Sequence, residues 1–336
     1  MLKKTLAVLL LAVMMVMATQ AVYAGSTRAK RLVAQLYERR EATDAERQLS
    51  NYGPEVAEYA AVVLDDDTND RVRLAALRII ASVNGTTVEE DVIAVLNDKN
   101  NRIRQQAAKT LSVIGTTDAG IEPLKGLLND PYPNVRFNAI NALATLAPEK
   151  EVNVFIDALN DHDARIRKSA VIALGKIKNP KAVPALSKLV RDPDAGVRYE
   201  LTKALANIGT PDCVEPMALL MGDPDRKIRL LAVDEIGKIK TSAADDSLVL
   251  AADSSDSKIA SKAIISLGER KSSKALAVAR KHLSNEYMVV KLACIEVVGK
   301  MGNRSDKALL EPLLEAESSS VRMQARRAMQ ELDSKT

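Results

Sequence analysis

Aspartates in short turns are the side chains of this chain whose spacing comes nearest to a chemical site. Pairs of Asp separated by one residue recur at Asp161 and Asp163, Asp192 and Asp194, and Asp223 and Asp225. Carboxylate oxygens are the ligands that calcium prefers, so one interpretation of these pairs is metal binding. The other is structural, because an Asp can accept hydrogen bonds from the first N–H groups of a helix and from an arginine of a neighbouring turn. The pairs recur at a fixed interval, which favours the structural interpretation.

Groups needed for catalysis are scarce in the rest of the chain. There are two histidines, His162 and His282, and neither belongs to the His-Glu pair that a di-iron site would need. The sequence contains no Cys-x-x-Cys, no His-Glu-x-x-His, no Gly-x-Ser-x-Gly and no glycine-rich phosphate loop. We therefore expect a protein that is not an enzyme, with no catalytic residue, no metal and no cofactor.

Two cysteines are present, Cys213 and Cys294. Cys294 takes a position that is alanine in seven other repeats, and Cys213 begins a helix two repeats earlier. With helices packed about 9–10 Å apart, their separation should be roughly 20 Å. A disulfide needs Cα atoms within about 7 Å of each other. We expect two free thiols.

The aspartate turns belong to a repeat that runs through most of the chain and sets the positions of its helices. A Val or Ile, followed in most copies by a basic residue, recurs every 31 residues with one step of 32, at Val72, Ile103, Val135, Ile166, Val197, Ile228, Ile259, Val290 and Val321. The residues four, eight and eleven positions later are mostly apolar, and these offsets fall on one stripe of a helix. A second apolar segment precedes each turn. The pattern predicts an all-α fold, an α-solenoid of about nine helix-turn-helix repeats over residues 53–333.

Some repeats depart from the pattern. The seventh has Ser254 in place of the turn Asp, Ala260 in place of the basic residue and Arg270 at a core position. We predict an irregular stacking angle or a softer joint there. The last repeat has Arg326 where the next layer would pack, as expected of a terminal cap. Residues 25–52 are expected to form an N-terminal helical cap.

The consensus of these units resembles a known repeat. The stretch Asp192-Pro193-Asp194-Ala195-Gly196-Val197-Arg198, continued by Ala204-Leu205 and Ile208-Gly209, is similar to the short HEAT repeat of the phycobilisome-lyase HEAT-like type. The resemblance covers about residues 53–333. It implies a right-handed solenoid whose second helices line the concave side. It also implies a possible relation to bilin lyases, which share the repeat and act as paired subunits in the cytoplasm.

The N-terminal segment predicts export. Lys3 and Lys4 precede a 13-residue apolar run, and Val22-Tyr23-Ala24 offers small residues at both positions that signal peptidase inspects. We interpret residues 1–24 as a signal peptide, with a retained membrane anchor as the alternative. After cleavage no membrane span is expected, and the mature protein should be periplasmic or secreted.

Composition gives little support to nucleic acid as a partner. The net charge is +4, and removal of Lys3 and Lys4 with the signal peptide lowers it to +2. Many arginines belong to the repeat signature and are expected to be paired within the fold. Aromatic residues make up 3% of the chain, and there is no Trp.

The variable surface of the second helices is the candidate binding site. Offsets two, six and nine after the Val/Ile point away from the core and should line the concave face. The residues that we expect to bind a partner are Phe137, Asn141, Lys168, Ile172, Tyr199, Lys203, Leu230, Asp234, Ile265 and Leu292. Offset nine is small in eight repeats, including Gly175, Gly237, Gly268 and Gly299, and should leave a floor on which a ligand chain could lie. The alternative is that these side chains pack against one another across a tightly curved superhelix.

These observations favour a non-catalytic scaffold or adaptor in the periplasm. We expect it to hold a peptide or helix of another protein in the concave groove and to be a monomer outside that complex. The alternatives are a bilin-lyase-like chaperone or enzyme subunit, and a structural protein that binds the cell envelope.

Overall fold

The computed structural model describes residues 27–66 and 68–335. The predicted signal peptide and Asp67 lie outside the described residues. In the described part of the chain every regular element is a helix, which confirms the all-α prediction. Contacts divide the chain into two units, residues 1–154 and 155–336, which are taken separately below.

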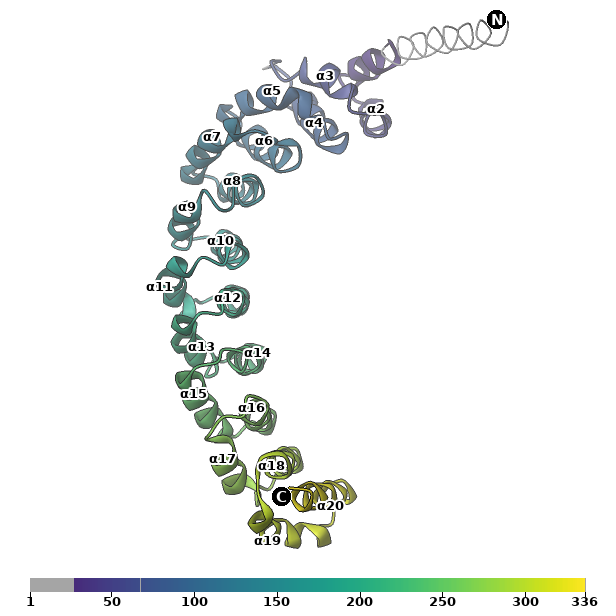
Figure 1. Cartoon of the computed structure of the whole chain (residues 1–336). Coiled ribbons are helices and arrows are strands. Elements are labelled where there is room, and N and C mark those ends of the chain that lie inside the picture. Colours follow the sequence, from purple (N-terminus) through teal and green to yellow (C-terminus); the bar gives the residue numbers. More distant parts are fainter. Residues whose placement is uncertain (1–26, 67, 336) are drawn as a thin grey trace, which may run out of the picture. The chain divides into compact units, whose positions relative to one another are not determined.

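From residue 56 on, unit 1 is built from helix pairs in which a short first helix precedes a longer second helix (Figure 1). Short 3₁₀ segments (η) flank the first helices. Its elements are a helix at residues 27–35, then α2 (Ala42–Leu49), α3 (Val56–Ala61), α4 (Asp70–Ser82), η1 (Thr86–Val88), α5 (Glu89–Ala94), η2 (Val95–Asn97), α6 (Asn101–Ile114), η3 (Asp118–Gly120), α7 (Ile121–Gly126), η4 (Leu127–Asn129) and α8 (Pro133–Leu146).

Unit 2 continues the same alternation, with α9 (Val152–Ala158) beginning just before the boundary. Its other elements are α10 (Ala164–Ile177), η5 (Pro180–Ala182), α11 (Val183–Leu186), η6 (Ser187–Arg191), α12 (Ala195–Ile208), η7 (Pro211–Cys213), α13 (Val214–Leu220), α14 (Arg226–Ile236), α15 (Ser242–Ala252), α16 (Ser257–Glu269), α17 (Ala275–His282), α18 (Met288–Met301), η8 (Arg304–Asp306), α19 (Lys307–Leu310), η9 (Glu311–Glu315) and α20 (Ser319–Asp333).

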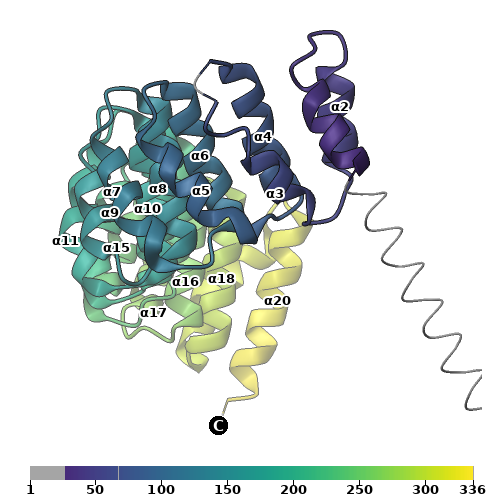
Figure 2. The ribbon, with the colours of Figure 1, turned by 90° about the horizontal axis from the view of Figure 1, so that it is seen from above.

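The second helices of unit 2 form one row and the first helices another. In Figure 1, α10, α12, α14, α16 and α18 lie along the inner side of this unit's curve, and α11, α13, α15 and α17 lie along its outer side. Figure 2 shows α18 and α20 side by side, and the two helices are in contact. The expectation that second helices line the concave side holds for this unit.

The predicted apolar stripe forms the core. The nine Val/Ile positions that define the repeat are between 0% and 2% exposed. The residues four positions later are all fully buried, and those eight positions later are fully buried in every repeat but the last. Burial of apolar surface in each pair against the next is what stabilises a repeat stack.

Aspartates in the turns cap the N-termini of the second helices, as expected. The side chains of Asp163, Asp194, Asp225 and Asp256 each accept a hydrogen bond from a backbone N–H in the first turn of the following helix. Such a cap satisfies a donor that has no partner within the helix. Asp192 precedes Pro193 and has an extended ψ of 136°, so the first helix ends there.

The small residues at offset nine do not form a floor for a ligand, and that prediction is wrong. A Cβ added at Gly175 would lie 2.7 Å from the Cα of Ala204 on the next second helix. At Gly268 it would lie 2.6 Å from the Val297 side chain, and at Gly299 2.8 Å from that of Ala328. These glycines are small because the neighbouring second helix packs directly against them.

We predict that Gly175→Ala lowers the free energy of unfolding by about 1–3 kcal/mol, because the methyl group forces α10 and α12 apart. The matched control is Gly126→Ala in α7, where an added Cβ meets nothing within 4 Å. That change should stabilise by about 0.5–1 kcal/mol, since alanine favours the helix. Thermal and denaturant melts check both variants, and a stabilising Gly175→Ala would contradict the packing interpretation.

Arg270 does not leave a defect in the seventh repeat. Its side chain is 9% exposed and forms an ion pair with Asp245 at 2.7 Å. Its guanidinium donates to the carbonyls of Ile236, Gly237, Ile239 and Thr241, at the end of α14 and just beyond it. This arginine therefore closes the C-terminus of the preceding second helix. The softer joint at this repeat stays a prediction, for which hydrogen exchange is the check.

Candidate functional site

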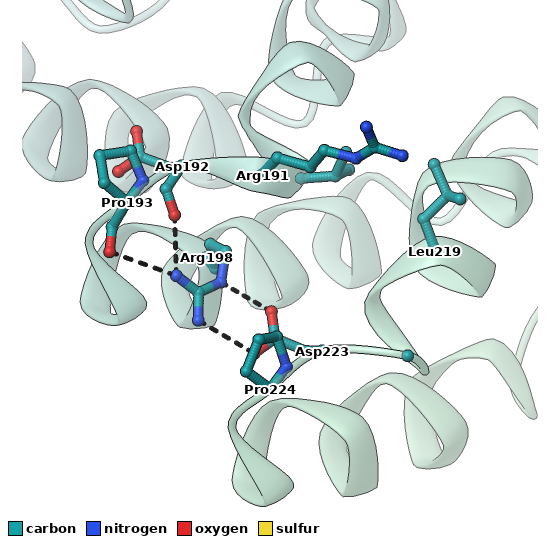
Figure 3. A pocket seen from close by; sticks show the side chains of 9 residues that line it. Arg191, Asp192, Pro193, Arg198, Leu219, Asp223 and Pro224 are labelled. Carbon is teal, nitrogen blue, oxygen red and sulfur yellow. Dashed lines mark hydrogen bonds and ion pairs between the residues drawn. The ribbon is translucent and has the colours of Figure 1, made fainter.

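The turn aspartates bind arginines and backbone N–H groups. In unit 2 the Arg198 guanidinium donates to both Asp223 oxygens, at 2.7 and 3.0 Å, and to the carbonyl of Asp192 at 2.7 Å (Figure 3). Arg167 repeats the arrangement one layer earlier, with distances of 2.7 and 2.8 Å to the Asp192 carboxylate. Each arginine thus joins its own turn to the next one. We call this series the Arg–Asp ladder.

The ladder is buried and electrostatically satisfied. The side chains of Arg198 and Asp223 are 11% and 1% exposed. Burial alone would raise the pKa of Asp223, but hydrogen bonds from Arg198 and from the Asp225 N–H hold it below its ordinary value. Asp223 is therefore a carboxylate whose oxygens already have donors, which supports the structural interpretation of the Asp pairs.

The ladder is interrupted at the seventh repeat. Ser254 stands where the next Asp would be, so Arg229 has no such carboxylate. Arg229 still donates to the Asp223 carbonyl at 2.7 Å, but its nearest carboxylate, Asp256, is 3.8 Å away. Asp256 pairs mainly with Arg226 at 2.6 Å.

A cavity of about 490 Å³ opens beside the ladder in unit 2. Arg198, Asp192 and Asp223 form its polar side, and Pro193, Pro224 and Leu219 are among its apolar lining residues. In Figure 3 the Arg191 guanidinium points away from the Arg198 cluster. Arg198, Asp192 and Asp223 are engaged with one another, so what the cavity offers is mainly its shape, apolar contact and the Arg191 guanidinium.

The predicted partner-binding residues lie on the second helices of both units. Phe137 and Asn141 are half-buried on α8 in unit 1. In unit 2, Tyr199 is 39% exposed and Lys203 is exposed. The half-buried members of the set in unit 2 are Lys168, Ile172, Leu230, Asp234, Ile265 and Leu292. None is fully buried, so each retains surface that a partner could contact.

Two of the predicted charges are already paired. Lys203 contacts Glu200 at 2.9 Å and lies 5.7 Å above the Tyr199 ring. Asp234 forms an ion pair with Lys262 on the next second helix at 2.6 Å. Both charges are therefore paired within the fold.

The predicted set omits several exposed residues of the same face. Lys227 and Lys258 precede the Val/Ile of their repeats by one position and are exposed. Met288 and Val289, at the start of α18, are 47% and 41% exposed. A helical wheel carried one turn further toward each helix N-terminus would have found them, because their positions also recur with the period.

The cysteines and His282 do not form a reactive site with one another. Cys213 and Cys294 are free and buried, and burial raises the pKa of Cys294 to about 12. The His282 Nε2 lies 3.0 Å from an Asp253 oxygen. Within residues 27–66 and 68–335 no three His, Cys, Asp or Glu side chains gather as a metal site. In the same part of the chain, every helix is too short or too polar to cross a bilayer.

Comparisons with known proteins identify the repeat. A family model described as HEAT repeats matches residues 60–131, 121–200, 186–260 and 246–330. A phycocyanin operon protein Z of Pseudanabaena tenuis (strain PCC 7409) is 28% identical over 116 residues, which is 32% of this chain and 56% of that protein. The chain thus spans about half the length of this curated relative.

One solved structure aligns along nearly the whole chain. The crystal structure of an engineered protein matches with a TM-score of 0.53 and 20% identity, over 91% of this chain and 99% of the other. That likeness concerns the fold. The four family matches together run from residue 60 to residue 330. The chain therefore belongs to the HEAT repeat family.

Proposed function

We propose that this HEAT repeat protein is a non-catalytic scaffold or adaptor that binds another protein along the second helices of unit 2. One observation carries the proposal: apolar side chains on this face remain in contact with water, with Tyr199, Met288 and Val289 exposed and Leu230 and Ile265 half-buried. Apolar surface that a fold leaves in contact with water often marks an interaction site. Repeat solenoids use such concave surfaces for extended partners.

The variation between repeats supports the same surface. Offsets zero and eight are apolar in all nine repeats, whereas offset two changes from Lys168 to Tyr199 to Leu230 in three successive copies. Repeats that stack in the same way need similar residues at their packing positions. Different residues at equivalent exposed positions provide a surface that distinguishes one partner from another.

The test is capture of the partner by tagged protein purified from its native cells, followed by mass spectrometry. The variant Tyr199→Ser with Leu230→Ser should weaken capture by about 30-fold or more, as for loss of a binding hot spot. The matched control is Leu219→Ser with Leu250→Ser, because these leucines are 54% and 75% exposed on the first helices. The control should retain the partner.

The outcomes separate the alternatives. One protein recovered in stoichiometric amount, and lost only with the Tyr199 and Leu230 changes, supports the scaffold. Recovery with murein or polysaccharide alone contradicts it and favours an envelope-binding protein. Equal retention of the partner by both variants places the contact elsewhere, and equal loss with unchanged helicity and melting contradicts its restriction to the second helices.

The compartment is part of the proposal. Residues 1–24 carry the charge and apolar run of a signal peptide, which supports export to the periplasm or beyond. N-terminal sequencing of protein isolated from a periplasmic fraction should begin at Gly25. Protein that stays in the cytoplasm with Met1 or Leu2 at its N-terminus would contradict export.

A second function has one observation in its favour, the phycocyanin operon relative. On that basis the chain would assist chromophore attachment as a bilin-lyase-like subunit. Co-expression with phycocyanin subunits and a bilin tests it, with a coloured covalent adduct as the positive result. Absence of an adduct, with partner capture intact, leaves the scaffold.

A further inference from the structure

Basic residues concentrate on the second helices of unit 2. Together α10, α12, α14, α16, α18 and α20 carry 16 Lys or Arg against 7 Asp or Glu, a difference of +9. The first-helix segments of the same unit, from α11 and η6 through α13, α15, α17, α19 and η9, carry 5 of each. The two rows of helices therefore differ in charge.

Ion pairs within the fold neutralise several of these arginines, whereas most of the lysines without an ion pair lie on α10, α14 and α16. Arg167 and Arg198 are held in the ladder, and Arg226 is held by Asp256. In contrast, the ammonium groups of five lysines on these helices make no ion pair with another described residue: Lys168, Lys176, Lys227, Lys258 and Lys291. On the same helices Glu269 is the acidic residue without a partner among the described residues.

These lysines surround the apolar part of the face. Lys168, Tyr199 and Leu230 hold the same position in three consecutive repeats, so they lie side by side on α10, α12 and α14. Lys227 and Lys258 come three residues before that position in their own repeats, about one turn nearer the helix N-terminus. Tyr199 and Leu230 thus have cations on either side.

The length of this surface matches a short segment of chain. Packed helices are about 8–10 Å apart, so the three intervals from α10 to α16 span about 24–30 Å. An extended polypeptide covers about 3.3–3.6 Å per residue, so this span corresponds to roughly seven to nine residues.

We infer that the partner presents to this face an acidic segment of about seven to nine residues, in which carboxylates alternate with apolar side chains. The carboxylates pair with Lys168, Lys227 and Lys258, while the apolar side chains contact Tyr199 and Leu230. The inference rests on the proposed function and names the partner's chemistry. Complementary charge of this kind raises association rates and rejects basic partners.

Nucleic acid fits the face less well than an acidic peptide. Arginine is the side chain that grips phosphates in two places at once, and the ladder arginines are already bound to Asp192 and Asp223. The exposed cations that remain stand among apolar side chains, and Asp234 also lies on this face.

The experiment measures fluorescence anisotropy of labelled ten-residue peptides with the full mature protein. The probes are an alternating Glu/Leu peptide and its Lys/Leu and Gln/Leu counterparts, with a ten-nucleotide oligothymidine as the anionic alternative. The Glu/Leu peptide should bind at least about tenfold more tightly than either counterpart, and more weakly as salt rises.

The variant for this test is Lys168→Glu with Lys227→Glu and Lys258→Glu. It should weaken Glu/Leu binding by about tenfold or more, because three favourable pairs become repulsive. Its matched control changes three other exposed lysines of unit 2, Lys181, Lys188 and Lys240, to Glu and alters the net charge equally. The control variant should bind the Glu/Leu peptide with a Kd within about twofold of that of the unchanged protein, well short of a tenfold change.

Outcomes against the inference are equally concrete. It is overturned if the Glu/Leu peptide does not bind, if the Lys/Leu or Gln/Leu peptide binds as well, or if both triple variants lose binding equally. Tighter binding of oligothymidine than of any peptide points to nucleic acid instead. The two claims can also be told apart with the native partner. If the Lys168, Lys227 and Lys258 variant still captures it and the Tyr199 and Leu230 variant does not, the proposed binding face is supported and the acidic character of the partner is rejected.

Discussion

Replacing Arg198 with leucine should lower the free energy of unfolding by about 3–5 kcal/mol, the usual cost of removing one partner of a buried ion pair. The change leaves the Asp223 carboxylate 1% exposed without its arginine, and leaves the Asp192 carbonyl without its donor. Denaturant unfolding of the mature protein measures the effect. Because a repeat array can unfold in parts, hydrogen exchange of α12 and α14 should accompany it.

Arg229→Leu is the matched control for Arg198→Leu. Arg229 occupies the same position one repeat later, yet its nearest carboxylate oxygen is 3.8 Å away and its side chain is 25% exposed. Its replacement should cost about 1 kcal/mol, mostly from the hydrogen bond to the Asp223 carbonyl. Equal costs for the two variants would show that the ladder carboxylates contribute nothing.

The difference between Arg198→Leu and the unchanged protein should depend on pH. The pKa of Asp223 is held below its ordinary value in the folded protein, so this group stabilises the fold above about pH 4, near its unfolded pKa. That stability is lost as the pH falls through the folded value. The variant lacks it, so the two proteins should differ most near pH 7 and converge below pH 4.

Arg270→Ile should destabilise the protein by about 2–4 kcal/mol, although it restores the apolar residue that most other repeats have at this offset. The substitution removes donors to four backbone carbonyls and leaves Asp245 without its arginine. Arg191→Ile, at an exposed position, is the control and should change the unfolding free energy by less than about 0.5 kcal/mol. A more stable Arg270→Ile would show that the consensus side chain is preferred there.

Most of the fold could be predicted from the period. Burial of Val197 and its eight counterparts follows from their place on the apolar stripe, and the caps at Asp163 and Asp194 follow from residue type and position. The pairing of Arg198 with an aspartate of the next repeat was also foreseeable, because both residues recur with the same interval.

Contacts between helices could not be predicted in the same way. Gly175 lies opposite the core on a single helix, and its small size is explained only by Ala204 of the next helix, whose Cα would lie 2.7 Å from a Cβ added at Gly175. Arg270 breaks the pattern in sequence, and its acceptors are carbonyls whose positions depend on where α14 ends. The candidate face was identified by offset, but its uncompensated lysines emerge only when the ion pairs are known.

The most direct test of a partner-binding second-helix face is site-specific photo-crosslinking in native cells. Benzoylphenylalanine is placed at Tyr199 or Leu230 on the second helices, and at Leu219 or Leu250 on the first helices, in otherwise unchanged protein. Irradiation should yield one discrete adduct with the same partner from both second-helix positions and none from the first-helix positions. An adduct from Leu219 or Leu250, with none from Tyr199 or Leu230, would contradict the assignment of this face.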